Sequence, residues 1–220
     1  YGLGGDGFNP QAAKKIYEAK GRPSANPLIL HINKREELDA IAARIPETAE
    51  KLMDAFWPGP MTLIFEKTKA VPYETTGGLD TVAVRMPSHE GARQLIESAG
   101  VPVAAPSANT SGRPSPTTAE HVKEDLWGRI DMIIDGGLVG IGVESTIIDV
   151  TEETPTILRP GYINQEMVRR VIGQVQMDRG LIQADSKVKP KAPGMKYRHY
   201  APKADLTVVE GSTKAVQEKI

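Results

Sequence analysis

Two cationic residues are spaced in a way that suits an anion. Lys20 and Arg22 are separated by Gly21 and followed by Pro23. If this segment is extended, both side chains project to the same side, and arginine can bind a phosphate or carboxylate through two hydrogen bonds. The alternative is a pair of solvated charges after a helix C-terminus, where cations are favoured in any case. Spacing alone favours this second interpretation.

A polar stretch follows a short apolar run in the segment 101–121, which reads VPVAAPSANTSGRPSPTTAEH. The run 101–105 is long enough for a buried strand, and Pro106 breaks it into a loop of Ser, Asn, Thr, Gly and Arg. We expect Ser115 or Thr117 to cap a following helix. Free backbone N–H groups and the helix dipole favour an anion at such a turn, although an ordinary strand–loop–helix connection has the same composition.

Three further residues lie where their chemistry requires a partner. Arg85 lies inside the apolar segment TVAVRM, so its charge needs either a ligand or a buried ion pair. Arg159 ends a short apolar stretch in the turn LRPG, where it either binds a phosphate or caps the edge of a sheet. His31 lies in the apolar run LILHI and has no partner at metal-ligand spacing, which is typical of a core histidine.

The candidate functional residues, taken together, indicate a protein that transfers a phosphoryl or nucleotidyl group. They are mostly Arg, Lys, Ser, Thr and Asn at strand ends and in loops, and they suit positioning of phosphates by charge. The glycine-rich loop DGGLVGIGVEST lets backbone approach a ligand near Glu144 and Ser145. The chain has no Cys, HxxxH pair, nucleophile elbow or Walker A lysine, which argues against thiol chemistry and against the sites that those motifs form.

The overall composition is that of a soluble globular protein. The chain has 220 residues, of which 40% are hydrophobic and 25% charged, and its net charge of −1 does not indicate a global nucleic-acid-binding field. No apolar run has transmembrane length and no cysteine is present, so we expect a cytoplasmic protein. Because the opening YGLGGDGF reads as the middle of a motif, we expect residues upstream of Tyr1.

The hydrophobic periodicity predicts an α/β fold with a twisted mixed sheet and flanking helices, because short strands alternate irregularly with helices. We expect a catalytic domain over residues 1–177 that lacks its N-terminal strand, a linker or lid over 178–203, and the start of a second α/β domain over 204–220. The expected helices cover residues 11–20, 35–44, 46–56, 90–99, 119–126, 165–172 and 212–220. The expected strands cover residues 28–32, 61–66, 81–86, 101–105, 132–134, 146–150, 156–158 and 205–210.

Six sequence blocks, taken in order, resemble one known family. They are KGRPSANPLILHI, FWPGPMTLIFEKT, GLDTVAVRMP, VPVAAPSANTSGRPSPT, GVESTIIDV and LRPG. These blocks are similar to those of the YrdC-like threonylcarbamoyl-AMP synthases, and the resemblance covers nearly all of residues 1–202. The block APGMKYRHYAP resembles the linker of the longer, two-domain members. YGLG is similar to the end of a family motif whose preceding residues, PTETV, are absent here.

The resemblance implies an enzyme that joins L-threonine, bicarbonate and ATP and releases threonylcarbamoyl-AMP and pyrophosphate. This product feeds threonylcarbamoyladenosine formation on tRNA through a downstream transferase, and Mg²⁺ accompanies the ATP. The family's KxR…SxN constellation corresponds to the catalytic residues Lys20, Arg22, Ser107 and Asn109. No residue is implied as a protein ligand of a metal.

The same resemblance implies two sets of binding residues. The ATP-binding set is Arg22, Asn26, Thr81, Ser107, Ser115, Arg159, Tyr197 and His199. The threonine-binding set is His31, Arg85, Ala105 and Ser145, with Arg85 pairing the amino-acid carboxylate. Tyr197 and His199, with Tyr200, lie in the linker that folds over the site in two-domain relatives.

Two other functions are compatible with parts of the sequence. The first is a non-catalytic module that binds double-stranded RNA through a local basic face, which the net charge of −1 does not favour. The second is the carbamoyl-transfer domain of hydrogenase maturation proteins, which usually carry zinc-finger and acylphosphatase-like segments that have no counterpart in this sequence.

Overall fold

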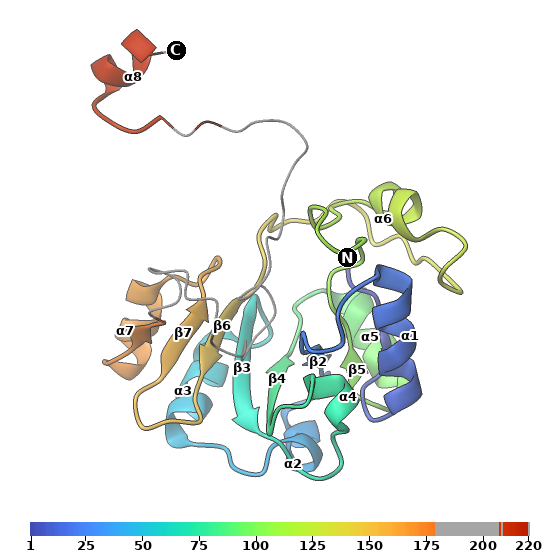
Figure 1. Cartoon of the computed structure of the whole chain (residues 1–220). Coiled ribbons are helices and arrows are strands. Elements are labelled where there is room, and N and C mark those ends of the chain that lie inside the picture. The colour runs from blue at the N-terminus through green and yellow to red at the C-terminus, as the bar shows by residue number, and fades with distance from the viewer. Residues whose placement is uncertain (179–206, 208, 220) are drawn as a thin grey trace.

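A mixed β-sheet forms the centre of the protein in this computed structural model, which describes residues 1–178, 207 and 209–219. Its eight strands lie in the order β1-β5-β2-β4-β3-β6-β7-β8 (Figure 1). The pairs β2/β4, β3/β6 and β7/β8 are parallel and the other neighbouring pairs are antiparallel, which confirms the predicted mixed α/β sheet. The strands are β1 Gly5–Asp6, β2 Ile29–His31, β3 Met61–Glu66, β4 Thr81–Arg85, β5 Val103–Ala104, β6 Thr146–Asp149, β7 Thr156–Arg159 and β8 Gln176–Met177.

The helices begin and end at residues whose side chains or backbone suit those positions. The Asn9 side chain accepts a hydrogen bond from the backbone of Gln11, and Gly21 ends the helix in the left-handed region with φ 61°. The helices are α1 Pro10–Lys20, the 3₁₀ turn η1 Arg35–Glu37, α2 Leu38–Ile41, α3 Glu47–Phe56, α4 Tyr73–Thr76, α5 Glu90–Ala99, α6 Ala119–Leu126, α7 Gln165–Ile172 and α8 Thr213–Lys219. None of them, within the described chain, is both long and apolar enough to cross a bilayer.

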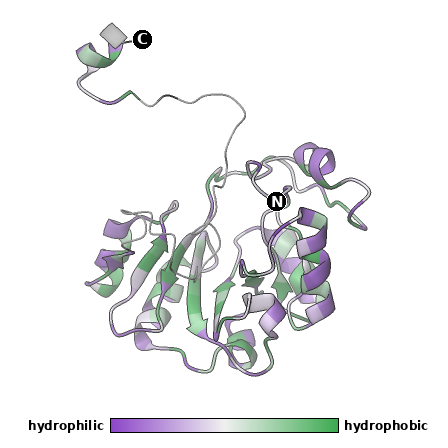
Figure 2. Cartoon of the chain, viewed as in Figure 1, coloured by the Kyte–Doolittle hydropathy of each residue, from purple (hydrophilic) through white to green (hydrophobic). Residues whose placement is uncertain are grey.

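The two faces of the sheet have different partners. One face, which includes Leu30, Leu63 and Val84, belongs to a large buried core with residues of α1, α2, α3 and α7. Alternation along each strand sends the intervening residues to the opposite face. There a smaller cluster consists only of strand residues, and Figure 2 shows how apolar these strands are. The members of this cluster are Ile29, Ile64, Ala83, Ile147 and Leu158.

Several predicted elements differ from the structure. The expected strand 132–134 is wrong, because Met132 and Ile134 lie in an unpaired loop with 70% and 55% of their surface exposed. The expected helix 35–44 is confined to η1 and α2, which end at Ile41. Of the expected strand 101–105, only the two residues of β5 form a strand. An apolar run of three residues, as at 132–134, does not by itself distinguish a strand from a loop.

The cap of α6 is also different from the prediction. Neither Ser115 nor Thr117 caps it; the hydroxyl of Thr118 accepts from the backbone N–H of His121 at 3.4 Å. Thr117 instead donates its backbone N–H to the His121 side chain. The five residues before the helix, 114–118, are all proline or hydroxyl-bearing, which made the choice of cap ambiguous in the sequence.

The predicted domain boundaries remain predictions. Of the expected linker 178–203, only Asp178 is among the described residues. Three of the six residues of the expected strand 205–210 are described, namely Thr207, Val209 and Glu210, and none of these three is in a strand. The expected helix 212–220 corresponds to α8, which covers Thr213–Lys219.

Candidate active site

Lys20, the last residue of α1, joins that helix to the loop after β5. Its side chain is buried, with 2% of its surface exposed. Its Nζ donates to the backbone carbonyl of Ser107, to the carbonyl of Asn109 at 2.5 Å, and to the Asn109 side-chain oxygen at 3.5 Å. The structure therefore brings three of the four predicted catalytic residues into direct contact.

Arg22, the fourth, leaves α1 through a turn rather than along an extended segment. The conditional prediction that Lys20 and Arg22 project to one side of a strand is wrong, because Gly21 turns the chain with φ 61° and ψ 37°. The Arg22 guanidinium donates to the Pro27 carbonyl at 3.2 Å. Burial, and next the Arg22 cation, lower the pKa of Lys20 to about 7. The two cations are therefore neighbours after all.

Asn26 is buried in the same loop and keeps one polar atom unsatisfied. The Tyr17 hydroxyl donates to the Asn26 backbone carbonyl at 3.1 Å, which holds the loop on α1. The side-chain oxygen of Asn26 is buried and accepts no hydrogen bond within the described residues. A buried acceptor of this kind is costly unless a ligand or water satisfies it.

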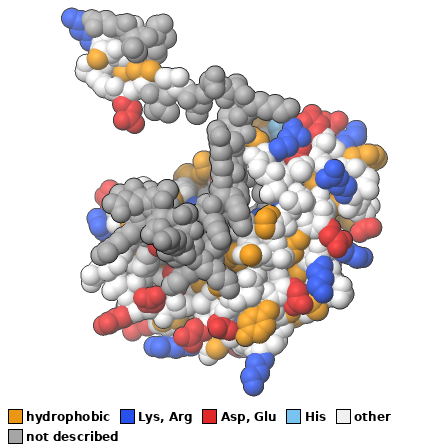
Figure 3. Space-filling view, viewed as in Figure 1, with side chains coloured by type: hydrophobic (Ala, Val, Ile, Leu, Met, Phe, Trp, Pro, Cys, Tyr) orange, Lys and Arg blue, Asp and Glu red, His pale blue; other side chains and the backbone are white. Residues whose placement is uncertain are grey.

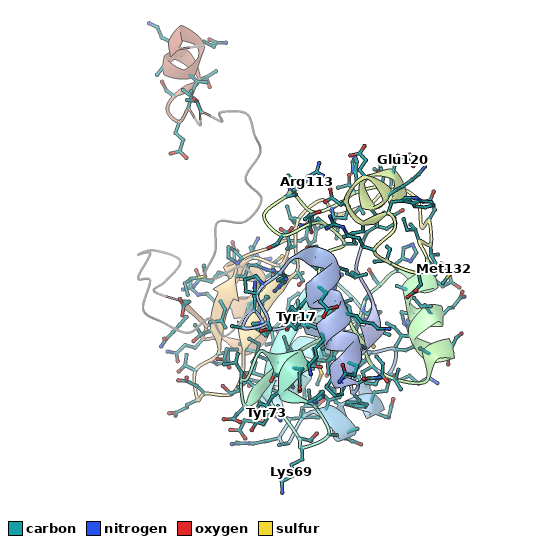
Figure 4. The ribbon with its side chains drawn as sticks, turned by 45° about the vertical axis from the view of Figure 1, so that its right-hand side comes forward. Tyr17, Lys69, Tyr73, Arg113, Glu120 and Met132 are labelled. Atoms are coloured by element: carbon teal, nitrogen blue, oxygen red, sulfur yellow. The ribbon has the colours of Figure 1, made fainter. Side chains whose placement is uncertain are left out.

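Asp125, in the last turn of α6, fixes the polar loop from the other side. Its carboxylate is only 4% exposed, accepts from the backbone N–H of Thr110 at 2.9 Å and forms an ion pair with Arg113 (Figure 4 labels Arg113 beside α6). Asn109 in turn donates to the carbonyls of Thr110 and Arg113 at 2.8 and 2.9 Å. Asp125 was not among the predicted site residues, although an acidic residue in the last turn of a helix, where cations are favoured, is a usable signal.

A second group of residues forms a row across neighbouring strands, on the sheet face that carries the smaller apolar cluster. His31 of β2 pairs in register with Arg85 of β4, and Arg85 pairs with Thr62 of β3. Further along the sheet, Ile147 of β6 pairs with Arg159 of β7. Residues paired in register share a face, so His31, Arg85 and Thr62 lie on the face that the helices of the large core do not cover. A register shift between Ile147 and Ile148 interrupts the alternation beside β7, and Arg159 is placed by its contact with Ser145.

Arg85 carries a charge that no carboxylate neutralises within the described residues. Its Nε donates to the Gly59 carbonyl at 2.9 Å, and no ion pair involves it there. Burial and the nearby Arg159 cation lower the pKa of Arg85. The two positive charges are therefore close enough to repel each other. The alternative of a buried structural ion pair is therefore not found, and the charge suits an anionic ligand.

His31 is neutral at physiological pH. Burial, and next the Arg85 cation, lower its pKa to about 4. Its Nδ1 lies 3.2 Å from the Ile29 carbonyl, and the backbone of Val103 also lies beside the ring. In the tautomer that carries its proton on Nδ1, Nδ1–H donates to Ile29 and Nε2 is the acceptor. The ring is thus more than a packed core residue: it offers an acceptor beside a cation.

Arg159 and Ser145 are bound to each other at the end of the row. The Arg159 Nε and Nη2 atoms lie 3.1 and 2.9 Å from the Ser145 carbonyl oxygen, and Nη2 lies 3.1 Å from the Ser145 hydroxyl. That hydroxyl is also 2.8 Å from the Thr62 hydroxyl. Thr62 was not among the predicted site residues, because a threonine in an apolar strand carries no local signal of function.

The two groups are linked by their loops. Ser115 donates to the Glu144 carboxylate at 2.7 Å, and the backbone of Val139 donates to Thr117 at 3.1 Å, so the loop that follows β5 is bound to the loop that leads into Ser145. The backbone N–H of Ala105 donates to Ile29, two residues before His31. The loop after β5 is therefore bound both to Lys20 and to the loop that leads into Ser145.

The remaining predicted residues lie either farther along the sheet or outside the described residues. Thr81 begins β4 on the same face as Arg85, four positions away along the strand, or about 13 Å at the usual rise of about 3.3 Å per residue. Tyr197 and His199 lie outside the described residues. Within the described chain, no group of three or more His, Asp or Glu side chains is arranged to hold a metal ion.

Comparison with known proteins identifies the family. A family model for Sua5, YciO and YrdC proteins, described as telomere recombination, matches residues 1–161. The chain belongs to the Sua5/YciO/YrdC family. A second model, described as the C-terminal domain of threonylcarbamoyl-AMP synthase, matches residues 163–220.

Similar proteins in this family span the whole chain. The threonylcarbamoyl-AMP synthases of Pyrococcus abyssi and Bacillus subtilis are 55% and 53% identical to it, over 100% of the chain and 64% and 63% of their own lengths. The chain therefore spans slightly less than two thirds of these relatives.

Solved structures in the family have the same fold. The structure of P. abyssi Sua5 complexed with L-threonine matches with a TM-score of 0.96 at 55% identity, over 100% of this chain and 64% of that one. E. coli YciO matches with a TM-score of 0.66 at 29% identity, over 74% of this chain and 79% of its own.

Proposed function

We propose that the protein is an L-threonylcarbamoyladenylate synthase, which makes threonylcarbamoyl-AMP and pyrophosphate from L-threonine, bicarbonate and ATP. The observation that carries the proposal is the presence of two pairs of neighbouring cations, Lys20 with Arg22 and Arg85 with Arg159. The loop that contacts Lys20 is hydrogen-bonded to the loop that leads into Ser145, the partner of Arg159. The name of the relatives and the threonine complex of P. abyssi Sua5 support the choice of substrates.

The proposed reaction has two steps in which bonds and charges balance. The amino nitrogen of L-threonine takes up the carbon of bicarbonate with loss of water and a proton, which gives N-carboxythreonine. One carbamate oxygen then attacks the α-phosphorus of ATP, the new O–P bond forms, and the bond from the α-phosphorus to the bridging oxygen breaks to release pyrophosphate. Both reactants are anions, so fixed cations supply most of the stabilisation that the attack requires.

Each group of residues has a part in this scheme. Lys20 and Arg22 would bind phosphate oxygens, while Ser107 and Asn109, held by Lys20 and by the Asp125 network, would contact the α-phosphate region. Arg85 would pair with the carboxylate of threonine, beside the neutral ring of His31. This arrangement separates the leaving pyrophosphate from the amino acid while keeping both on one face.

We propose that Mg²⁺ enters with ATP, because its preferred ligands are phosphate oxygens, water and one or two protein oxygens. The described residues offer hydroxyl and amide oxygens near Lys20 rather than a cluster of carboxylates. This donor set suits a cation that is already bound to a triphosphate. Its role there would be to neutralise charge on the phosphates.

The proposed product points to the setting in which the protein works. Threonylcarbamoyl-AMP is a reactive mixed anhydride, so a transferase must take it and pass the threonylcarbamoyl group to tRNA. We therefore place the protein in the cytoplasm with such a transferase as its functional partner.

The test is pyrophosphate release measured with the three substrates together and with each one omitted. We expect release that depends on all three, and its loss in Arg22→Ala, with the far-ultraviolet circular dichroism spectrum of the folded chain retained. L-threonine should give a clear calorimetric binding signal and L-alanine little, since a site built around a hydroxyl rejects its absence. Release that is independent of threonine would contradict the proposal.

A further inference from the structure

Thr62 places a buried hydroxyl between the two arginines of the row. It lies in β3, none of its surface is exposed, and its neighbours in register are Arg85 on β4 and Ile147 on β6. Its Oγ1 is 2.8 Å from the Ser145 Oγ, and in the described chain this is the one side-chain hydrogen bond that it forms. The proposed mechanism assigns no role to Thr62.

The direction of that hydrogen bond follows from the neighbouring donors. Arg159 Nη2 lies 3.1 Å from the Ser145 hydroxyl, and a guanidinium can only donate, so Ser145 accepts there. If Ser145 also donated to Thr62, the proton of Thr62 would be buried with no acceptor among the described residues. If Thr62 donates instead, its own proton is satisfied and the Ser145 proton is free to point elsewhere.

Exposure of the two hydroxyls agrees with this direction. Thr62 is completely buried, whereas Ser145 retains 4% of its surface and can reach a ligand or water. With two donors directed at it, the Ser145 oxygen has no lone pair left to accept from a ligand. It is therefore available as a donor only.

We propose that Thr62 is a positioning residue that fixes Ser145 as a hydrogen-bond donor toward the amino-acid substrate. Ser145 accordingly contacts an acceptor oxygen of that substrate, namely its carboxylate, hydroxyl or carbamate oxygen, and does not contact its ammonium group. Arg85, the register neighbour of Thr62, adds positive charge on the same face, which favours an anionic or polar oxygen there. This inference rests on the proposed function, because L-threonine is taken as the ligand.

The test compares L-threonine and ATP binding by calorimetry in the full chain and its variants. Thr62→Val keeps the shape and removes the hydroxyl, so L-threonine should bind about tenfold more weakly while ATP affinity is unchanged, as expected for loss of one hydrogen bond of about 1.4 kcal/mol. Thr62→Ser keeps the hydroxyl and should stay within about twofold of the wild type. In a Ser145→Ala background, Thr62→Val should have no further effect.

Thr146 provides a matched control. It is another fully buried threonine in the same sheet, but its hydroxyl donates to the Ile163 backbone carbonyl at 2.7 Å. Thr146→Val should lower the melting temperature and leave threonine affinity at the wild-type value. If Thr62→Val does not fold, Thr62→Cys, whose thiol is a weak donor, should show the same selective weakening at about threefold.

Three results would overturn the inference. Unchanged threonine affinity in Thr62→Val, with threonine binding by the wild type intact, would remove the role of Thr62 and leave the proposed function standing. Equal losses in Thr62→Val and Thr146→Val would reduce Thr62 to a packing residue. A wild-type chain that fails to bind L-threonine would instead contradict the proposed function, and the inference with it.

Discussion

Lys20 combines a geometry that suits an ammonium ion with an environment that disfavours it. Three oxygen acceptors surround its Nζ, which matches the three N–H donors of the protonated amine. Burial and the Arg22 cation nevertheless lower its pKa to about 7, and Asp125 opposes this by raising it. Near neutral pH, both protonation forms are therefore populated, and an anion placed beside the amine decides between them.

Binding of ATP is therefore expected to take up a proton at Lys20. At about pH 8, above the pKa of about 7, the free amine is mostly neutral, and a bound triphosphate raises its pKa so that it gains a proton. Below about pH 6 the amine is already protonated, and the uptake at Lys20 disappears. Calorimetry in two buffers of different ionisation enthalpy measures the proton number, which Lys20→Met should abolish at about pH 8. Equal heats in both buffers at that pH would contradict the assignment.

At the scale of the elements, local patterns predicted what local forces determine. The strand Met61–Glu66 and the helix Glu90–Ala99 are observed with the predicted bounds, because a short apolar run after Pro60 defines the strand, and capping by His89 and Gly100 defines the helix. The segment 132–134 has apolar residues but no neighbouring strand, and only tertiary structure reveals that. The two-residue strand Gly5–Asp6 is too short to have a pattern at all.

The candidate site was less accessible to sequence reasoning than the elements. The charges in apolar or rigid contexts, such as Arg85 and Lys20, indicated an anion site, and family resemblance supplied their grouping. The contact of Lys20 with Asn109 depends on the antiparallel pairing of β5 with β2, which no local pattern shows. Asp125 and Thr62 were missed because each acts through another residue rather than through a motif.

Asp125 connects α6 to the loop after β5 that carries Ser107 and Asn109, so its removal should weaken the binding of ATP more than that of L-threonine. Asp125→Asn loses the ion pair with Arg113 and the charge that raises the pKa of Lys20. We expect a loss of about 1–2 kcal/mol in unfolding free energy and about tenfold weaker ATP binding, with threonine affinity unchanged. The midpoint of proton uptake should also move to lower pH. Denaturant titration and calorimetry check these outcomes, with exposed Asp131→Asn as the control; an equal loss of threonine affinity would argue for general unfolding.

The turn after β7 leaves no room for a side chain at Gly161. A Cβ there would lie 2.4 Å from the Glu144 carbonyl oxygen and 2.7 Å from the Thr146 backbone nitrogen, on either side of Ser145. Gly161→Ala should therefore displace the Ser145 segment, cost about 1–3 kcal/mol in stability, and weaken threonine binding. Gly140→Ala, where a Cβ meets nothing within 4 Å, is the matched control. Threonine affinity that is equal in the two variants would show that the turn tolerates the strain without moving Ser145.

Across the whole molecule, function is expected from local charge and not from a global field. On the face shown in Figure 3, acidic and basic side chains are interspersed over the described surface, in agreement with the net charge of −1. Such a surface gives little long-range attraction to double-stranded RNA, so the RNA-binding alternative gains no support from it. The paired cations lie instead at or just after the ends of α1, β4 and β7, and the loops beside them, which carry Ser115 and Glu144, are hydrogen-bonded to each other.

The hydrogen bond between these two loops should couple the binding of ATP to the binding of L-threonine. Because Ser115 donates to Glu144, a ligand that orders the loop carrying Ser107 also restrains the loop carrying Ser145, and the second ligand has less ordering to do. Saturating L-threonine should therefore tighten binding of a non-hydrolysable ATP analogue about fivefold, at the low end of typical couplings. Glu144→Ala should bring the ratio of the two affinities close to one, whereas exposed Glu153→Ala should keep it. Calorimetry of the analogue with and without L-threonine measures the ratio, and full coupling in Glu144→Ala would show that the two half-sites communicate by another route.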